Sequence, residues 1–323
     1  MTSAAAYAGR TVLLTGGLGF MGSNVARALG DHPAEIRVLS RSWPSDHQMA
    51  SNERVRFFKG DIRNAAAVEQ AVAGCDFIFH FAGKSGPADS TASPIEDLDV
   101  NCRGLLILLE ACRSVAPSAK VVFPSSRLVY GPNLPVPVAE TAPLAPISIY
   151  GTHKLAAEGY LRIYSRLYGL KAVTVRLTNP YGPFQRPEQN RYGIVNWFVH
   201  QALKDQALTV YGDGQQLRDY VYIDDAVEAM LMAGTNPACD NLAINVGAGR
   251  PTSFVEMAEL VIQLTGTGRI EHVPWPEVEA RVETGDFVAD TSLIEKTLGW
   301  RATTSLERGL DLVVSHYAGL ARD

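Results

Sequence analysis

The sequence of 323 residues predicts an α/β fold, in which a doubly wound parallel sheet is joined to a smaller C-terminal α/β lobe. Three observations predict it. Short apolar runs alternate with amphipathic helical segments as far as residue 177, and parallel strands need such crossover connections. A glycine-rich segment directly follows the first apolar run. At roughly 100–200 residues per domain, the length suits about two lobes.

The strands and helices follow from these patterns in order. The strands are short runs of β-branched, aliphatic or aromatic residues, expected at 10–15, 36–39, 55–59, 77–81, 121–124, 172–177 and 242–246. The helices carry apolar side chains on one face and are expected at 23–29, 65–72, 101–115, 150–168 and 223–232. The pattern weakens beyond residue 179, because residues 180–219 are rich in Gly, Pro, Gln and Arg. From residue 247 short helices alternate with loops.

Composition and charge exclude several classes of protein. Hydrophobic residues make up 46% and charged residues 20%, which excludes a disordered chain, a collagen-like repeat and a disulfide miniprotein. A net charge of −5 argues against general binding to nucleic acid or to an anionic membrane, since both need a basic patch. No apolar run reaches the ~18 residues of a membrane span, and the N-terminus lacks the apolar core of a signal peptide. We therefore expect a cytoplasmic protein.

The cysteines give no sign of a metal site. Cys75, Cys102, Cys112 and Cys239 form no C-x-x-C pair and match no Cys/His cluster. They predict buried, reduced thiols instead of zinc ligands, and no metal is expected.

The glycine-rich segment predicts a dinucleotide site. Gly16, Gly19 and Gly22 form G-x-x-G-x-x-G between a predicted strand and a predicted helix. One glycine permits a tight turn, one lets the backbone approach a pyrophosphate, and one allows close helix–strand packing. The N-terminus of the helix then offers free N–H groups to the phosphates. These features are typical of a Rossmann-type βα turn.

The end of the second strand bears on the choice of cofactor. An acidic residue there would bind the 2′-hydroxyl of NAD, whereas an arginine accommodates the 2′-phosphate of NADP. The strand ends in Ser40-Arg41, without a carboxylate. The cofactor is therefore NAD or NADP, and Arg41 favours NADP unless it is an ordinary surface arginine.

Tyr150 and Lys154 are spaced i, i+4 at the start of a predicted helix, so their side chains share one face. A tyrosine has a pKa near 10, so its use as a base near neutral pH needs a shift of about three units, or roughly 4 kcal/mol. A fixed ammonium group and a bound, positively charged nicotinamide can supply part of this. Lys154 can also bond ribose hydroxyls. Taken alone, the pair could be accidental.

Together these motifs resemble the NAD-dependent epimerase/dehydratase family, the extended branch of the short-chain dehydrogenase/reductases. The resemblance covers nearly the whole chain and is more specific for the family than for the substrate. It rests on TGGLGFMG (15–22), GDIRN (60–64), HFAG (80–83), SSRLVYG (125–131), YGTHK (150–154), RLTNPYGP (176–183), YGDGQQLRDYVYIDDA (211–226), NVGAG (245–249) and LGW (298–300). It implies a Rossmann domain over 1–178, with 222–248 crossing back, and a nucleotide-sugar-binding lobe over 179–221 and 249–323.

The resemblance also implies the roles of particular residues. The cofactor contacts would be Gly16, Gly19, Phe20, Met21, Gly22, Ser40, Arg41, Asp61, Ile62, Phe81, Ala82, Gly83, Lys84, Tyr150 and Lys154. The catalytic residues would be Ser126, which holds the reacting oxygen, Tyr150 as acid/base, and Lys154 as its electrostatic partner. The substrate contacts would be Ser126, Asn179, Asn196, Arg218 and Arg281.

The guanidinium of Arg218 suits a diphosphate, because it can form two parallel charge-assisted hydrogen bonds. The alternative for Arg218 is a salt bridge with Asp219 or Asp224.

The sequence departs from the family pattern at two places, and the first of them narrows the choice of reaction. Sugar-nucleotide dehydratases carry an acid after the Ser/Thr, where this chain has Arg127 and Leu128, so 4,6-dehydration and the related decarboxylation are disfavoured. That leaves 4-epimerisation through a transient 4-keto sugar or, as the alternative, NADPH-dependent reduction of a 4-keto-sugar nucleotide. A further alternative is a non-catalytic regulator on the same fold. Such proteins typically lack the Tyr or the Lys, whereas this chain has both.

The second departure lies near the C-terminus. Where the family often has the arginine of R-x-G-D, this chain has Glu283, with Arg281 two residues earlier. If Arg281 replaces the missing arginine, the loop must shift.

The expected partners are a nucleotide-sugar and a second copy of the chain. The sugar nucleotide would be a UDP-, GDP- or dTDP-hexose, selected by the loops at 184–200 and 272–286. The resemblance implies a homodimer through the helices near 101–115 and 150–168. Leucines extend around more than one face of the first of these helices, which suits burial on two sides; they are Leu105, Leu106, Leu108 and Leu109.

Overall fold

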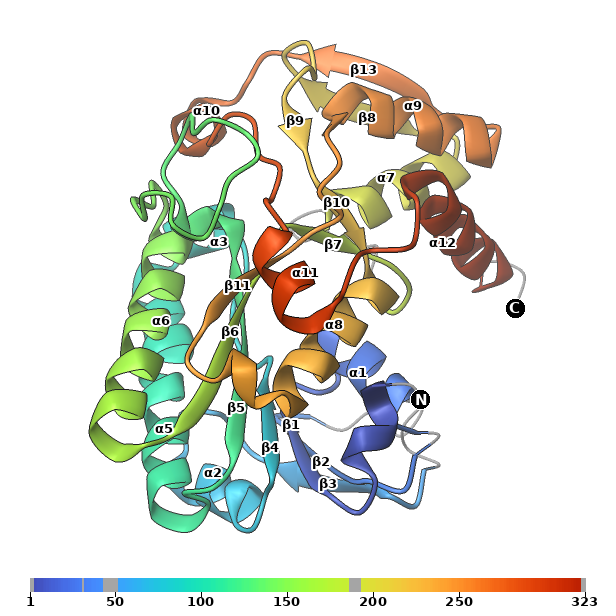
Figure 1. The fold of residues 1–323 in the computed structure, drawn as a ribbon. Helices are drawn as coiled ribbons and strands as arrows, with labels where there is room; N and C mark the ends of the chain where they lie inside the picture. Colours follow the sequence, from blue (N-terminus) through green and yellow to red (C-terminus); the bar gives the residue numbers. More distant parts are fainter. Residues whose placement is uncertain (1–2, 31, 43–51, 186–192, 321–323) are drawn as a thin grey trace.

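A parallel sheet with helices on both faces forms the larger part of the molecule (Figure 1). The computed structural model describes residues 3–30, 32–42, 52–185 and 193–320. Within these residues the sheet has seven strands, in the order β11-β6-β5-β4-β1-β2-β3, and every neighbouring pair is parallel. The strand order reverses at β1, so the ends of β1 and β4 border the crevice where such sheets bind ligands. The predicted doubly wound fold is confirmed.

The strands are buried on both faces, which explains their continuous apolar runs. They are β1 (Thr11–Thr15), β2 (Glu35–Ser40), β3 (Val55–Lys59), β4 (Phe77–His80), β5 (Lys120–Ser126), β6 (Lys171–Leu177) and β11 (Ala243–Val246). Successive side chains of a strand point to opposite faces. Val12 and Leu14 therefore join one core cluster, whereas Leu13 joins the other.

Two groups of helices cover these faces (Figure 1). One face packs against α1 (Phe20–Gly30) and α8 (Ile223–Thr235). The other packs against α2 (Ala65–Val72), α5 (Gly104–Val115) and α6 (Ile149–Tyr168).

Helix α6 has well-defined ends. The side chain of Ser148 accepts a hydrogen bond from the N–H of Gly151 at 3.1 Å, and Gly169 ends the helix with a φ of +70°. Tyr150 and Lys154 therefore lie in the first two turns of a capped helix.

Some elements differ from the prediction. Helix α1 begins at Phe20 and not at residue 23, so the last glycine of the loop lies in its first turn. The segment before α5 contains three elements that the sequence did not predict: α3 (Pro87–Ala92), α4 (Pro94–Leu98) and a π-helical turn over Asp99–Arg103. These are short pieces whose conformation depends on packing against α6, so they lack a long periodic pattern.

Beyond Leu177 the chain builds three small two-stranded sheets. Strands β7 (Asn179–Tyr181) and β10 (Tyr220–Tyr222) are parallel, as are β8 (Ala207–Tyr211) and β13 (Arg269–Val273). Strand β9 (Leu217–Arg218) is antiparallel to β12 (Thr252–Ser253). The remaining helices are α7 (Ile194–Leu203), α9 (Phe254–Thr265), α10 (Glu277–Val282), α11 (Ser292–Leu298) and α12 (Leu306–Leu320).

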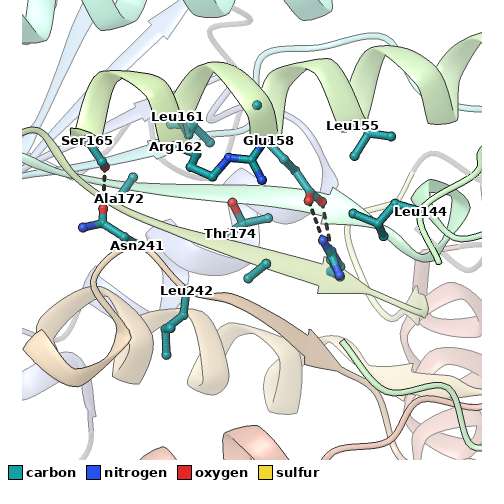
Figure 2. A pocket seen from close by; sticks show the side chains of 13 residues that line it. Leu144, Leu155, Glu158, Leu161, Arg162, Ser165, Ala172, Thr174, Asn241 and Leu242 are labelled. Atoms are coloured by element: carbon teal, nitrogen blue, oxygen red, sulfur yellow. Dashed lines mark hydrogen bonds and ion pairs between the residues drawn. The ribbon is translucent and has the colours of Figure 1, made fainter. Parts of the chain in front are cut away.

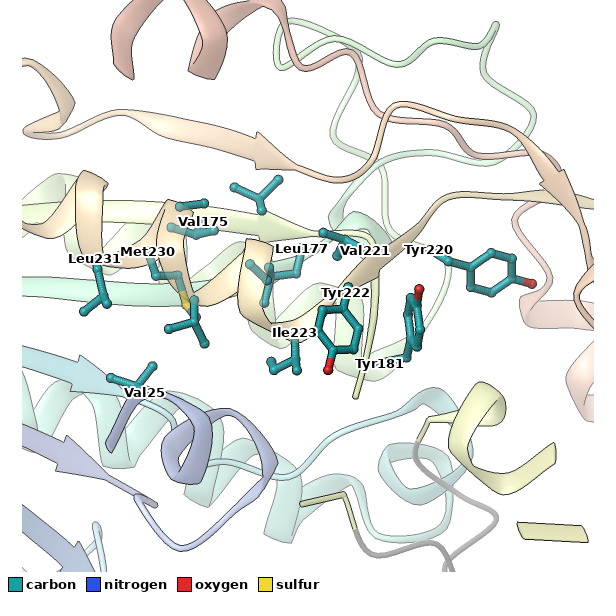
Figure 3. Close-up of a cluster of buried hydrophobic side chains, with 14 of the residues drawn as sticks. Val25, Val175, Leu177, Tyr181, Tyr220, Val221, Tyr222, Ile223, Met230 and Leu231 are labelled. Carbon is teal, nitrogen blue, oxygen red and sulfur yellow. The ribbon is translucent and has the colours of Figure 1, made fainter. Parts of the chain in front are cut away.

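One apolar core connects the small sheets to the large one. Figure 3 shows Val175 and Leu177 of β6 and Met230 of α8 on one side, with Tyr181 and Tyr222 of the β7–β10 pair beside them. The larger core cluster contains all five side chains. This shared core does not test the limits predicted for the two domains, which stay a prediction.

Among the described residues, the cysteines and the helices indicate no disulfide, metal site or membrane span. All four cysteines are buried, and none forms a disulfide. In the described ranges no group of three or more His, Cys, Asp or Glu side chains could hold a metal ion. Among those same residues, no helix combines the length and the apolar character needed to cross a membrane.

Candidate active site

The glycine loop after β1 lies directly against the chain that follows β4. A Cβ atom at Gly16 would lie 2.7 Å from the backbone nitrogen of Ala82, and the φ of Gly16 is +66°. A Cβ at Gly22 would lie 2.5 Å from the Cα of Gly17, whereas one at Gly19 would meet only the oxygen of Gly16, at 3.3 Å. The first and last glycines are therefore required by the backbone, and the loop leaves its N–H groups at the start of α1.

The loop at 81–84 is held by a buried asparagine. The backbone N–H of Lys84 donates to Oδ1 of Asn101 at 3.0 Å, and Nδ2 of Asn101 donates to the oxygen of Lys84 at 3.1 Å. A Cβ at Gly83 would lie 2.7 Å from the same Oδ1. Lys84 itself turns its ammonium group to Glu96, at 2.7 Å. The backbone of this loop is thus fixed beside the glycine loop.

The predicted adenine and ribose contacts lie at the ends of β2 and β3. Ser40 is the last residue of β2, and Arg41 after it is exposed. Asp61 forms an ion pair with Arg63 at 2.7 Å, and the hydrogen bond from Arg63 lowers the pKa of Asp61 to about 2. Ile62 is buried and packs against Gly104.

The glycine loop, the loop at 81–84 and the ends of β2 and β3 therefore lie at one edge of the sheet. The glycines of the first two segments leave no room for side chains there. This arrangement fits a dinucleotide, whose pyrophosphate the N–H groups of residues 19–22 would hold. Phe20 and Met21 are partly buried against the core, and Phe81 and Ala82 are partly buried behind the loop.

Tyr150 and Lys154 lie against the end of β5, which carries Ser126. The start of α6 packs so closely on the turn after β5 that a Cβ at Gly151 would lie 2.3 Å from the oxygen of Leu128. Lys154 Nζ donates to the oxygen of Pro124 at 2.8 Å and lies 5.8 Å from the centroid of the Tyr150 ring. These contacts place the tyrosine, the lysine and the end of β5 side by side.

Burial controls the proton affinities of this group. It raises the pKa of Tyr150 above the usual value, the negative charge of Asp97 adds to the rise, and a hydrogen bond with Ser85 opposes it. Burial lowers the pKa of Lys154 to about 8, while Asp97 opposes that shift. In the chain alone the pKa of Tyr150 is therefore above its usual value, and a lowering by Lys154 together with a bound nicotinamide stays a prediction.

A buried carboxylate beside this pair was not predicted. Asp97 of α4 is fully buried; its Oδ1 lies 2.6 Å from Nδ1 of His153 and 3.0 Å from Nδ2 of Asn101. Its Oδ2 has no hydrogen-bond partner. A single acidic residue in a short helix gives no sign in the sequence that its side chain is buried. The position of His153 inside Y-x-x-x-K was the only indication of this contact.

A second buried ion pair lies behind the end of β5. Arg176 Nη2 is 2.7 Å from Oε2 of Glu158, and Arg176 Nη1 donates to the hydroxyl of Tyr130 at 2.9 Å. The hydroxyl of Ser125 donates to the other oxygen of Glu158 at 2.5 Å.

Figure 2 shows Glu158 at one side of a pocket of about 180 Å³ between α6, β6 and residues 241–243. This pocket is smaller than most ligand sites, which have volumes of roughly 300–1,000 Å³. None of the residues predicted to bind cofactor or substrate lines it.

Arg218 is buried and already paired. Its Nη2 lies 2.6 Å from Oε1 of Glu283, and its Nη1 donates to the oxygen of Gly285 at 2.9 Å. The partner is neither of the two aspartates that the sequence suggested. Asp219 instead accepts hydrogen bonds from three backbone N–H groups, those of Ala248, Gly249 and Ala289. Asp224 pairs with Arg27.

Asn179 of β7 pairs with Tyr220 of β10. Its Nδ2 donates to the backbone oxygen of Asp219 at 2.9 Å, so part of its side chain is engaged within the protein.

Two predicted substrate contacts have partners within the protein. Arg281 of α10 pairs with Glu277 on the surface, and 75% of its side chain is exposed. Asn196 is fully buried, and its carboxamide bonds to the backbone N–H of Gly182 and the hydroxyl of Tyr317. Their contact with substrate stays a prediction. Of the predicted substrate loop at 184–200, residues 186–192 lie outside the described residues.

A model of the NAD-dependent epimerase/dehydratase family matches residues 12–247, well over half of the chain. The chain belongs to this family. As a member of it, the protein is an NAD-dependent enzyme of the nucleotide-sugar epimerase/dehydratase type.

Individual relatives agree with this assignment. The UDP-glucose 4-epimerase of Mycolicibacterium smegmatis is 32% identical over 314 residues, which cover 94% of this chain and 97% of the relative. The structure of a UDP-glucose 4-epimerase with UDP-glucose from Thermotoga maritima has a TM-score of 0.87 and 32% identity, and the match covers 96% of this chain and 99% of that one.

Dehydratases of the family also resemble the chain. A double mutant of the dTDP-glucose 4,6-dehydratase from Streptomyces venezuelae, with NAD bound, has a TM-score of 0.84 and 29% identity over 95% of this chain and 96% of that one. Overall similarity therefore does not separate the reactions within the family, and the separation must come from single residues at the site.

Proposed function

We propose that this epimerase/dehydratase family member is a nucleotide-sugar 4-epimerase that works through a transient 4-keto sugar. One observation carries the proposal. Tyr150 and Lys154 lie against the end of β5, where Ser126 is followed by Arg127 and Leu128. Dehydration of the sugar would need a carboxylic acid there, whereas epimerisation needs only one acid/base and a hydride carrier.

The roles of the chain's own groups follow from the geometry. Tyr150 takes the proton from the sugar O4 and later returns it, and Ser126 Oγ positions that oxygen. The ammonium group of Lys154 is fixed by Pro124 and supplies positive charge beside the phenol. The N–H groups of residues 19–22 would hold NAD, which would supply the hydride acceptor and donor for the sugar. Burial of Tyr150 keeps bulk water from exchanging the proton.

The alternative is a reductase of 4-keto-sugar nucleotides that uses the same residues with NADPH. The exposed Arg41 beside a strand end without an acid supports a 2′-phosphate. The two functions differ in whether the cofactor leaves the enzyme, because an epimerase retains its dinucleotide and a reductase releases it in each cycle.

The deciding experiment identifies the nucleotides released when the purified protein is denatured. Retained NAD supports the epimerase. The protein is then incubated with UDP-, GDP- and dTDP-hexoses, and failure to isomerise any of them refutes the epimerase. Stoichiometric NADPH oxidation with a 4-keto sugar nucleotide supports the reductase.

Replacement of the acid/base separates an enzyme from a non-catalytic regulator. In Tyr150→Phe, turnover should fall by about 10²–10⁴-fold while nucleotide binding survives. Turnover that does not depend on Tyr150 contradicts the proposed role.

We further propose a homodimer through α5 and α6. Ile163 and Leu167 of α6 are 49% and 64% exposed, and Leu106 of α5 is only partly buried. A second copy would cover these apolar side chains. Sedimentation should show a dimer in the wild type, and Leu167→Glu should shift it toward the monomer; a monomeric wild type refutes this.

A further inference from the structure

Two arginines and a tyrosine surround the segment at 283–285. Arg218 is bonded to Glu283 and to the oxygen of Gly285. Nη1 of Arg127, which follows Ser126 directly, donates to the hydroxyl of Thr284 at 2.8 Å. The two arginines therefore contact neighbouring residues of one segment.

Among the described residues Arg127 forms no ion pair, although Glu283 and Asp219 are near enough for their charges to act on it. Its guanidinium lies 5.6 Å from the ring centroid of Phe287, and its one hydrogen bond among the described residues goes to a neutral hydroxyl. Burial lowers the pKa of Arg127, and the nearby charge of Arg218 lowers it further. A partly buried cation without a carboxylate partner is stabilised by an anionic ligand.

The hydroxyl of Tyr220 is a second unpaired group, and the residue lies two positions after Arg218 in the chain. Tyr220 is 5% exposed, and among the described residues its hydroxyl has no hydrogen-bond partner. Figure 3 shows Tyr220 at the edge of the apolar cluster, with its hydroxyl pointing away from Tyr181 and Tyr222. Burial raises the pKa of Tyr220, and the charges of Arg218 and Arg127 oppose the rise.

Glu283 neutralises only one of the two arginines. Its carboxylate accepts from Nη2 of Arg218 and from the backbone N–H of Gly285, at 2.6 and 2.9 Å. The group of Arg127, Arg218 and Glu283 therefore carries one net positive charge. Arg281, which the sequence suggested as a second cation, is bonded elsewhere on the surface.

We infer that Arg127, Arg218 and the Tyr220 hydroxyl form one oxyanion site that binds the diphosphate of the substrate, with Glu283 as an internal carboxylate that the diphosphate displaces from Arg218. This inference rests on the proposed function, because a nucleotide-sugar supplies the diphosphate. It assigns Arg127 a use that its position in place of the dehydratase acid did not suggest. It also makes Glu283 a competitor of the ligand.

Calorimetric titration of the full-length protein with UDP tests the site. Arg127→Gln should weaken UDP binding by about 10–100-fold, the effect of losing a hydrogen bond to a charged group. Arg301→Gln, the matched loss of an arginine whose side chain is 74% exposed in a surface pair with Glu295, should stay within about twofold of the wild type. Glu283→Gln should strengthen binding by about threefold or more, because no carboxylate then competes for Arg218.

Tyr220→Phe separates ligand binding from structural support. The hydroxyl has no partner within the protein, so its removal should leave the melting temperature equal or higher while UDP affinity falls by about fivefold or more. Thr284→Val, which removes only the internal partner of Arg127, should leave UDP affinity within about threefold. If Arg127→Gln does not fold, Arg127→Lys should bind UDP with intermediate affinity, since it keeps the charge and loses the planar fork.

Several results overturn the inference. One is unchanged UDP binding in Arg127→Gln. Another is weakened binding in Glu283→Gln, which would make Glu283 a support for the site. A third is a loss confined to UDP-glucuronate with UDP-glucose unaffected, which would assign Arg127 to a sugar carboxylate. A wild type that binds none of UDP, GDP and dTDP refutes the proposed function itself, and the inference with it.

Discussion

Removing the charge of Glu158 should destabilise the protein substantially. The Glu158–Arg176 pair links α6, which carries Tyr150, to β6, and only 9% and 5% of the two side chains are exposed. Burial lowers the pKa of Arg176, but the hydrogen bond and charge of Glu158 outweigh it, so the net shift is upward. In Glu158→Gln the buried guanidinium would keep only uncharged partners, such as the hydroxyl of Tyr130.

The size of the effect follows from this burial. Breaking a buried pair by removing one partner costs about 3–5 kcal/mol, and glutamine, which retains an acceptor, should lie near 3. A chain of 323 residues has an unfolding entropy of about 0.7 kcal/mol per kelvin. The expected fall in melting temperature is therefore about 4 °C, and up to about 7 °C for Glu158→Ala.

Calorimetry and urea unfolding of six proteins test this prediction: the wild type, Glu158→Gln, Glu158→Ala, Glu158→Met, Arg176→Met and the double Met variant. The double variant should be more stable than either single variant, because two apolar side chains leave no unpaired charge. A loss below about 1 °C in Glu158→Gln, or a double variant as unstable as both single losses combined, refutes the reasoning.

Three further predictions concern the site and its pH dependence. Asp97→Asn should move the whole pH–rate profile to lower pH, since Asp97 raises the pKa values of both Lys154 and the catalytic tyrosine; an unmoved profile contradicts this. Gly16→Ala should weaken dinucleotide binding at least about tenfold, measured by fluorescence titration, because its Cβ would collide with backbone atoms after β4. The control Gly159→Ala, in open space within α6, should stabilise the protein by about 0.5–1 kcal/mol. Burial, with the charge of Lys154, lowers the pKa of His80 from 6.5 to about 3. In this pH range His80 is therefore protonated in the unfolded chain and neutral in the folded one. Between pH 7 and pH 5 the free energy of unfolding should fall by about 2 kcal/mol through this group. In urea titrations of His80→Gln this part of the loss should be absent.

The local patterns that were predicted correctly are those in which neighbouring residues carry the information. The alternation of apolar runs with helical segments gave the sheet and its crossover helices, because periodicity is a property of contiguous residues. The glycine loop was predicted for the same reason, since its spacing lies within a single βα turn. The short elements α3 and α4 were missed, because each is stabilised by packing on α6.

The identity of charge partners could not be predicted. Arg218 pairs with Glu283, 65 positions away, and Asp97 with His153, 56 positions away. Each of these acids resembles a surface residue in the sequence. Asn196 was assigned to the substrate on family resemblance, but its carboxamide is used inside the protein.

The sequence by itself determined the fold class, and it predicted a dinucleotide role for the glycine loop and a catalytic role for Tyr150 and Lys154, since each pattern lies in residues close together along the chain. The tertiary structure alone decided which groups are buried, which charges neutralise one another and which are left over. Arg127 shows the difference: it is an unassigned cation in the sequence, and becomes an unpaired one beside Arg218 only after packing joins segments 157 positions apart. The physical reason is that desolvation and Coulomb energy depend on distance in space, and neither depends on position in the chain.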